Sequence, residues 1–279
     1  MKKKNTVTIA LVMILIASII FLIYRQRKST EAELFLNDWE GYICASNNEV
    51  FLLQIPWFVI NKDIKLSEIK FDLLNLPDTA EIIKKDIELR YSRENISQYL
   101  INFYIKIKTP HLYKNDNLNL IIEKSNVKDI IPLGRWVFEI IPYEQNELRI
   151  REHITMSSGK NIDYPYYMFV VENKSNQPVT LNDIAYDSPN LTKINIKYDD
   201  NATLENNEWK DFPIGGLTLA PFSSKAVAVF MESKNPQKLY ALKPKIIYSI
   251  NDKIFEMPGD MYLVIISMSK EDIIRKAMR

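Results

Sequence analysis

The stretch Tyr99–Lys108, YLINFYIKIK, decides the class of fold. Its odd-numbered positions are all aliphatic or aromatic, whereas Asn102, Lys106 and Lys108 lie at even-numbered positions. Because successive side chains of a β-strand point to opposite faces of the sheet, this stretch would bury one face and leave the other in water. It therefore predicts a half-buried antiparallel strand.

The same alternation recurs through the chain after residue 48. Leu148–Met156 shows it clearly, and polar turn signals such as Asn75–Asp78 and Asn173–Pro178 separate the segments. Many short strands joined by such turns are typical of antiparallel β-sandwiches or barrels, and helical patterns are scarce. Further strands are expected at Val50–Ile55, Ser67–Leu74, Ile82–Arg90, Leu118–Glu123, Trp136–Ile141, Tyr166–Val171, Val179–Tyr186, Leu191–Tyr198, Lys225–Met231, Lys245–Ile250 and Met261–Ser267.

The strand-rich part of the chain is long enough for two sandwiches, since one sandwich takes roughly 100 residues. The strand pattern lapses at Pro142–Asn146, so we expect a first sandwich over residues 49–144 and a second over residues 145–279. Near the C-terminus, Ser269 is followed three residues later by Asp272, a pattern close to a capping box. It predicts a short helix that ends at Met278. The fold class expected is all-β, with two tandem immunoglobulin-like sandwiches.

An apolar segment precedes the sandwiches. Residues 7–24, VTIALVMILIASIIFLIY, carry no charge and are long enough to cross a bilayer. Basic residues flank the segment on both sides, and no small-residue cleavage site ends it. We therefore predict a basic tail and uncleaved transmembrane signal anchor over residues 1–28, through which the chain contacts the membrane. The polar residues 29–48 are expected to form a juxtamembrane linker.

The distribution of charge fits such an anchor. Residues 1–28 hold six of the 36 basic residues and none of the 35 acidic ones, so residues 29–279 have a net charge of −5. A mildly acidic body gives no support to nucleic-acid binding, which needs a basic face. The basic residues on the two sides of the span nearly balance. Because a short basic tail before one span is the usual signal-anchor arrangement, we expect a cytoplasmic N-terminus and an extracytoplasmic body.

The second half of the chain has a recurrent pattern of strands and turns. The segment MFVVEN at 168–173 leads through a polar turn into PVTL at 178–181, and LTLAP at 217–221 leads into VAVF at 227–230. Residues 148–267 thereby resemble the immunoglobulin-like modules that bacteria place on the cell surface or in the periplasm. The resemblance implies a β-sandwich fold and carries no activity with it.

Motifs for catalysis are not evident in the sequence. Gly159-Lys160 lacks the other residues of a phosphate-binding loop, and no G-x-S-x-G nucleophile motif is present. The single cysteine, Cys44, has no second thiol for an internal disulfide, and His111 and His153 lie in turn or strand-surface patterns. The sequence therefore favours binding over catalysis.

One acidic loop is a candidate calcium site. Asp199, Asp200, Asn201 and Glu205 lie between two strand-like segments, and calcium prefers carboxylate and amide oxygens. The spacing is not that of an EF-hand. A solvated loop without metal is the alternative interpretation, and no other cofactor is expected.

Aromatic residues form two candidate recognition surfaces, at Tyr164, Tyr166 and Tyr167 and at Trp57. Flat aromatic side chains bind sugars and anchor protein interfaces. In a strand, however, alternate members of such a run must face the core, so core packing is the competing explanation. The sequons in the chain, Asn95-Ile96-Ser97 among them, are expected by chance in an Asn-rich sequence.

Together these features predict a membrane-anchored protein that acts by binding a protein partner, as an accessory or assembly subunit of a bacterial envelope complex. The alternative is a carbohydrate- or cell-wall-binding module or enzyme, in which the Tyr164–Tyr167 platform and carboxylates face one groove. A sensor is a third hypothesis, although the cytoplasmic tail is too short to signal alone.

Overall fold

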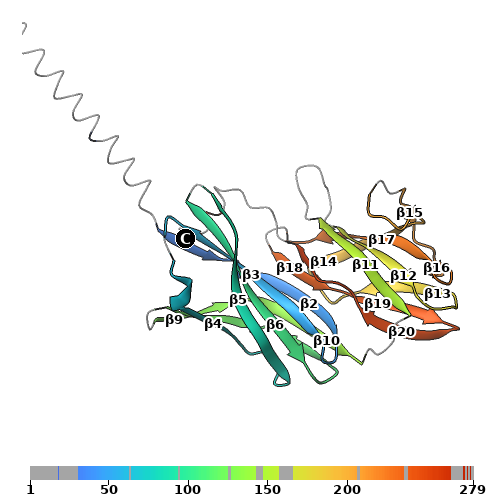
Figure 1. Ribbon diagram of the computed structural model, residues 1–279, viewed down its shortest axis with the longest axis horizontal. Coiled ribbons are helices and arrows are strands. Elements are labelled where there is room, and N and C mark those ends of the chain that lie inside the picture. The colour runs from blue at the N-terminus through green and yellow to red at the C-terminus, as the bar shows by residue number, and fades with distance from the viewer. Residues whose placement is uncertain are drawn as a thin grey trace, which may run out of the picture.

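The computed structural model describes residues 31–62, 64–93, 95–124, 127–142, 147–156, 166–205, 208–235 and 238–264, together with residues 18, 273, 275 and 277 (Figure 1). The described residues are mainly β-strand, with a short 3-10 helix, η1, at Leu66–Glu68. The predicted all-β class is confirmed. The strands form five sheets arranged around two separate hydrophobic cores.

Two sheets belong to the first core alone. One has the strand order β1-β3-β6-β5 and the other the order β4-β8-β9, and all their neighbouring strands are antiparallel. Their strands are β1 (Ala32–Phe35), β3 (Val50–Ile60), β4 (Ile69–Leu74), β5 (Ala80–Arg93), β6 (Ile96–Ile107), β8 (Asn119–Lys124) and β9 (Val127–Pro132).

Two further sheets contribute to the second core and not to the first. They have the orders β11-β12-β17-β14-β15 and β16-β13-β19-β20 and are also antiparallel throughout. Their strands are β11 (Leu148–Met156), β12 (Tyr166–Asn173), β13 (Val179–Ala185), β14 (Leu191–Asp199), β15 (Lys210–Asp211), β16 (Leu217–Leu219), β17 (Ser224–Ser233), β19 (Lys245–Ile250) and β20 (Lys253–Pro258).

The fifth sheet, called the central sheet below, has the order β21-β18-β2-β10-β7 and lies between the two cores (Figure 1). Strand β2 pairs in parallel with both β10 and β18, which differs from the wholly antiparallel sheets that we expected. The strands are β2 (Trp39–Ser46), β7 (His111–Asn115), β10 (Gly134–Ile141), β18 (Leu239–Lys243) and β21 (Tyr262–Val264).

Both faces of the central sheet are covered by protein. Trp39 and Ile43 of β2 belong to the first core, whereas Tyr42 and Cys44 of the same strand belong to the second. Every residue of β2 from Trp39 to Ala45 is buried. A strand buried on both faces loses the alternation of apolar and polar residues that marks a half-buried strand.

Two sequence predictions are corrected by this arrangement. Residues 29–48, expected to be a linker, contain β1 and β2, and β2 is the middle strand of the central sheet. Two polar residues of this segment, Glu33 and Glu40, form specific hydrogen bonds within the fold. The two halves are also not separate sandwiches, because β18 of the second half and β10 of the first flank β2 in one sheet.

A glycine makes the close pairing of β2 and β10 possible. Gly41 is the register partner of Trp136. A Cβ atom added to Gly41 would lie 2.1 Å from Cε3 of the Trp136 ring, which is far inside van der Waals contact. The indole of Trp136 therefore occupies the space above the glycine, and its Nε1 donates a hydrogen bond to the Leu133 carbonyl, 3.1 Å away.

Polar contacts fix the central sheet to the second half of the chain. The buried Glu40 carboxylate accepts hydrogen bonds from the Ser188 hydroxyl and from Asn190, whose Nδ2 is 2.6 Å away. The Glu139 carboxylate of β10 accepts one from the Tyr42 hydroxyl and one from Lys245 Nζ at 2.6 Å. These carboxylates connect strands β2 and β10 to the β13–β14 loop and to β19.

The predicted terminal helices fall mostly outside the described residues. The described part of the chain contains no helix that is long and apolar enough to span a bilayer, and of residues 7–24 it includes only Ser18, which is helical. Of the predicted C-terminal helix it includes Ile273, Arg275 and Ala277, which are also helical. Ile273 is buried in the first core.

Candidate functional site

Trp57, predicted as a recognition residue, is part of the first core. Its side chain is 1% exposed and stacks on the Phe35 ring at 5.3 Å between centroids. Its Nε1 donates a hydrogen bond to the Glu33 carboxylate at 3.2 Å. The neighbouring Lys124 ammonium lies 4.8 Å from the indole centroid. Trp57 is therefore not on a binding surface, because β3 turns this side chain inward.

The predicted tyrosine platform is likewise not assembled. Tyr167 is fully buried in the second core, where it stacks on Phe169, and its hydroxyl accepts a hydrogen bond from the Asp260 backbone at 3.0 Å. Burial raises the pKa of Tyr167 above its ordinary value. Tyr166 lies in β12 opposite Phe230 of β17, and Tyr164 lies outside the described residues. Core packing thus accounts for Tyr167, as strand alternation requires.

In the candidate calcium loop, Asp199 has a structural role. Its side chain is buried, and its Oδ1 and Oδ2 accept hydrogen bonds from the backbone N–H groups of Asn201 and Glu208 at 2.8 and 2.5 Å. These bonds hold the loop over the outer face of the β12 sheet, where Leu204 packs in a small apolar cluster. Asp199 therefore bonds to the loop near its beginning, at Asn201, and near its end, at Glu208.

Asp200 is neutralised by two lysines. Its carboxylate pairs with Lys225 and with Lys210, whose Nζ is 2.5 Å away. Hydrogen bonds to Lys210 and Lys225 lower the pKa of Asp200 to about 2. Two ammonium groups beside this carboxylate oppose the binding of a cation there.

The other two predicted ligands do not complete a metal site. Asn201 and Glu205 are exposed, and the Glu205 backbone N–H bonds to the Thr203 hydroxyl at 3.2 Å. No group of three or more His, Cys, Asp or Glu side chains within the described ranges is arranged to hold a metal ion. These four residues are therefore not grouped as calcium ligands, since Asp199 and Asp200 are bonded to other parts of the protein and Asn201 and Glu205 are exposed.

A different surface is formed by β5. This strand has 14 residues and lies at the edge of its sheet, and among the described strands it pairs with β6 alone. Figure 1 shows β5 as a long strand beside β6. Ile83, Leu89 and Tyr91 are 49%, 52% and 44% exposed on this strand. The intervening charges pair locally, as in the Lys84–Asp86 ion pair at 2.6 Å.

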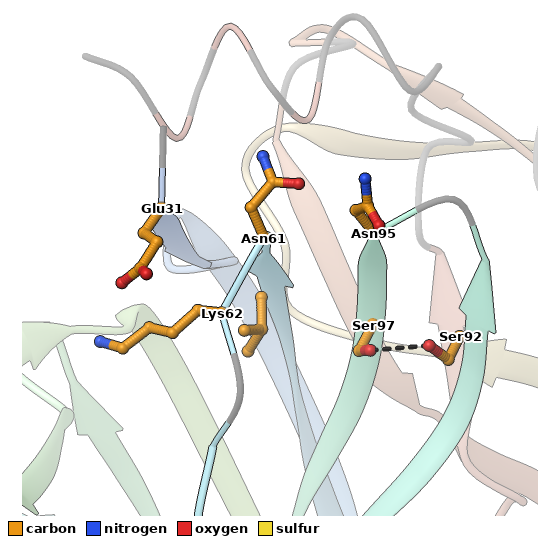
Figure 2. A pocket seen from close by; sticks show the side chains of 7 residues that line it. Glu31, Asn61, Lys62, Ser92, Asn95 and Ser97 are labelled. Carbon is orange, nitrogen blue, oxygen red and sulfur yellow. Dashed lines mark hydrogen bonds between the residues drawn. The ribbon is translucent and has the colours of Figure 1, made fainter. Parts of the chain in front are cut away.

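A polar pocket lies where β3 ends and β5 turns into β6 (Figure 2). Its volume is about 710 Å³. The hydroxyl groups of Ser92 and Ser97 lie 2.9 Å apart across the β5–β6 pair, as the dashed line in Figure 2 marks. The lining residues are Glu31, Val59, Asn61, Lys62, Ser92, Asn95 and Ser97.

An ion-pair cluster adjoins the pocket and includes its Lys62 side chain. Lys62 Nζ lies 2.8 Å from Glu33, which also pairs with Lys124. Burial alone would raise the pKa of Glu33, but hydrogen bonds from Lys124 and Lys62 outweigh burial and lower it. The hydrogen bond between Lys62 and Glu33, together with the negative charges of Glu33 and Glu31, raises the pKa of Lys62. Lys62 therefore stays a cation at neutral pH and is held in place.

Sequence reasoning missed this pocket because its residues come from three separate places along the chain. Glu31 precedes β1, and Val59, Asn61 and Lys62 come from the end of β3 and the residues after it. Ser92, Asn95 and Ser97 come from the β5–β6 hairpin. The one local signal was the sequon Asn95-Ile96-Ser97, two of whose side chains line the pocket.

Comparison with known proteins places the chain in no family. No family model matches it, and no curated protein matches it. A protein of unknown function from Porphyromonas gingivalis W83 is similar over 83% of this chain and 99% of its own, with 10% identity and a TM-score of 0.24. The C-terminal domain of the Streptococcus agalactiae AgI/II polypeptide BspA is similar over 84% of this chain and 99% of its own, with 6% identity and a TM-score of 0.22. Likeness at this level carries no argument about fold or function.

Proposed function

We propose that this protein acts by binding a protein partner, as a membrane-anchored accessory or assembly subunit of a bacterial envelope complex. In this proposal residues 7–24 span the membrane, the N-terminus is cytoplasmic, and the immunoglobulin-like β-layers and the C-terminal helix lie outside the cytoplasm. The single observation that supports the binding role best is the edge strand β5. It combines length, an unpaired side among the described strands and three exposed apolar side chains.

The chemistry of β5 suits one specific partner better than indiscriminate pairing. Exposed strand edges attract other chains, and proteins guard them with charges and bulges. β5 has both, because Lys84 and Lys85 lie in its middle and its register with β6 shifts near Ile82 and near Leu89. A partner that covers Leu89 and Tyr91 would bury apolar area that water now contacts.

Site-specific photocrosslinking tests the binding role. A photoreactive amino acid placed at Leu89 or Tyr91 of the full-length protein in its native membrane should give a discrete adduct with another protein, identified by mass spectrometry. The matched control is the same amino acid at Ile254 of β20, which is 71% exposed and lies on the second half of the chain. We expect no adduct from Ile254.

A charge substitution gives the second measurement. Leu89→Asp with Tyr91→Asp should reduce co-purification of the crosslinked protein at least about tenfold, whereas Ile254→Asp should not. A solitary protein with hydrolytic turnover, or equal adducts from β5 and β20, would refute the binding role.

Membrane topology is tested independently of the partner. Alkaline phosphatase fused to the C-terminus should be active, because that enzyme matures only outside the cytoplasm. A fusion active only as a cytoplasmic reporter would overturn the proposed orientation and leave the β5 experiment to be judged separately.

The alternative role as a saccharide-binding platform at Tyr164–Tyr167 is not retained. One of its three tyrosines, Tyr167, is buried in the second core.

A further inference from the structure

The pocket above β3 and the β5–β6 turn has the size of a ligand site. A volume of about 710 Å³ falls within the range of about 300–1,000 Å³ that small-molecule sites occupy. Most such sites are lined by apolar side chains with a few polar groups. Here Val59 is the one apolar residue among the described residues that line the pocket. A ligand that fits this lining must be polar over most of its surface.

The polar groups of the pocket can both donate and accept hydrogen bonds. The amides of Asn61 and Asn95 and the hydroxyls of Ser92 and Ser97 each contain a donor and an acceptor. The described lining residues include one carboxylate, Glu31, and one ammonium, Lys62, so the formal charges of these residues cancel. This balance is unfavourable for a phosphate or another strongly charged ligand and favourable for a neutral one.

The rim of the pocket is held in a fixed shape. Asn61 and Asn95 both have left-handed backbone conformations, with φ of 53° and 69°, which Asn tolerates better than most residues. The Asn61 backbone N–H donates a hydrogen bond to the Asn95 carbonyl at 2.8 Å, which ties the end of β3 to the β5–β6 turn. Because Glu33 holds Lys62 as well, a ligand would meet groups already in position.

We infer that this pocket binds a neutral oligosaccharide. The hydroxyl groups of a sugar are donors and acceptors at once. They can therefore bond to the two serine hydroxyls, the two asparagine amides, the Glu31 carboxylate and the Lys62 ammonium of this pocket. This inference goes beyond the proposed function, since it concerns a different surface from the exposed side chains of β5 and a different class of ligand.

Saturation-transfer NMR on the full-length protein tests this inference, in a detergent without a sugar head group. The probes are chitotriose, which has acetamido groups, maltotriose, which has hydroxyls alone, and the zwitterion alanyl-alanine. Saturation transfer to at least one trisaccharide is expected. Transfer to chitotriose alone indicates an acetamido-sugar ligand, and transfer to maltotriose alone indicates one recognised by hydroxyls. Both outcomes support the site.

Two variants locate the binding. Ser92→Ala with Ser97→Ala removes the paired hydroxyls, and Asn95→Gly removes an amide while glycine keeps the left-handed conformation. Each should weaken binding of the trisaccharide at least about fivefold. The matched control is Thr180→Val with Thr218→Val, which removes a cross-strand hydroxyl pair far from the pocket, on the second half of the chain. It should leave binding unchanged.

Three results would overturn the inference. These are no transfer to either trisaccharide, equal transfer in the pocket variants and the threonine control, or transfer to alanyl-alanine without transfer to a trisaccharide. The last result would assign the Glu31 and Lys62 pair to a zwitterionic ligand. Circular dichroism of each variant checks that the strands are intact.

Discussion

The two faces of the central sheet hold their neighbours by different means. The face toward the first core is dominated by large apolar side chains, among them Trp39, Trp136 and Phe138. The face toward the second core also has apolar residues, but it places the carboxylates of Glu40 and Glu139 among them. Apolar contact has no preferred direction, whereas hydrogen bonds do. The first face therefore supplies cohesion, and the second also fixes how the two halves are oriented.

The largest effect is expected on the apolar face. Trp136 is 1% exposed and lies 6.1 Å from Phe138 and 6.3 Å from Trp39 between ring centroids. Trp136→Ala should lower the free energy of unfolding by about 3–5 kcal/mol, because it removes buried area and leaves a cavity above Gly41. Urea unfolding of the full-length protein measures it. The control, Leu112→Ala on the exposed edge strand β7, should cost less than about 1 kcal/mol. Equal losses would contradict the assignment of Trp136 to the core.

A smaller effect on stability is expected on the face of the central sheet toward the second core. Glu40→Ala should cost about 2–3 kcal/mol, because the Ser188 hydroxyl and the Asn190 N–H groups lose a buried acceptor. Glu40→Gln keeps an acceptor and should cost less. Urea unfolding at neutral pH gives both values. Identical values for the two variants would show that charge and not hydrogen bonding is what matters at Glu40.

The pH dependence of Glu40 sharpens the same comparison. Burial alone would raise the pKa of Glu40, but hydrogen bonds from Ser188 and Asn190 outweigh it and lower the pKa below the ordinary 4.5. A carboxylate whose pKa is lowered by folding stabilises the fold at any pH above its pKa in the unfolded chain. This contribution to stability is lost as the pH falls through its pKa in the folded protein. Stability of the wild type should thus fall below about pH 4.5, and Glu40→Gln should flatten that fall.

The smallest effect is expected at Asp200, an ion pair on the outer surface of the second half. Asp200→Asn should change the free energy of unfolding by less than about 1 kcal/mol at neutral pH, because water already screens this pair. The pKa of Asp200 in the folded protein, about 2, lies below the ordinary 3.8. The contribution of Asp200 to stability is therefore complete at a pH above 3.8 and is lost as the pH falls toward 2. Unfolding curves at pH 7, 4 and 2 measure this. A larger loss than for Glu40→Ala would reverse the ranking.

The sequence predicts strands well where one face is buried. The segment Tyr99–Lys108 was recognised as a strand from its alternating sequence, and in β6 the burial of side chains alternates from Phe103 to Ile107. β2 was mistaken for a linker because two cores cover it and because Asp38 and Glu40 look like surface residues. The parallel pairing of β2 with β10 and β18 also leaves no local pattern, since it joins segments far apart in the chain.

The candidate sites show the same limit. Trp57 and Tyr167 have the residue types of a recognition surface, but the side of the strand on which each lies decides its role, and both point inward. The acidic loop has the right oxygens for calcium, yet the lysines that neutralise Asp200 come from β15 and β17. Composition reveals the chemistry that is present, whereas long-range pairing decides which groups meet.

The pairing of β2 with β18 also sets the order in which this protein can mature. Trp39 lies near the beginning of the described chain, and its register partner, Leu239, lies near the end. The first core includes Leu239 and Ala241, so it stays open until almost all of the chain has been synthesised. Contacts between such distant segments form slowly and leave apolar surface exposed in the meantime. If the chain were exported during synthesis, its first half would therefore leave the membrane before the first core could close. The exposed apolar side chains of that core would need protection from aggregation until β18 had been synthesised and paired with β2.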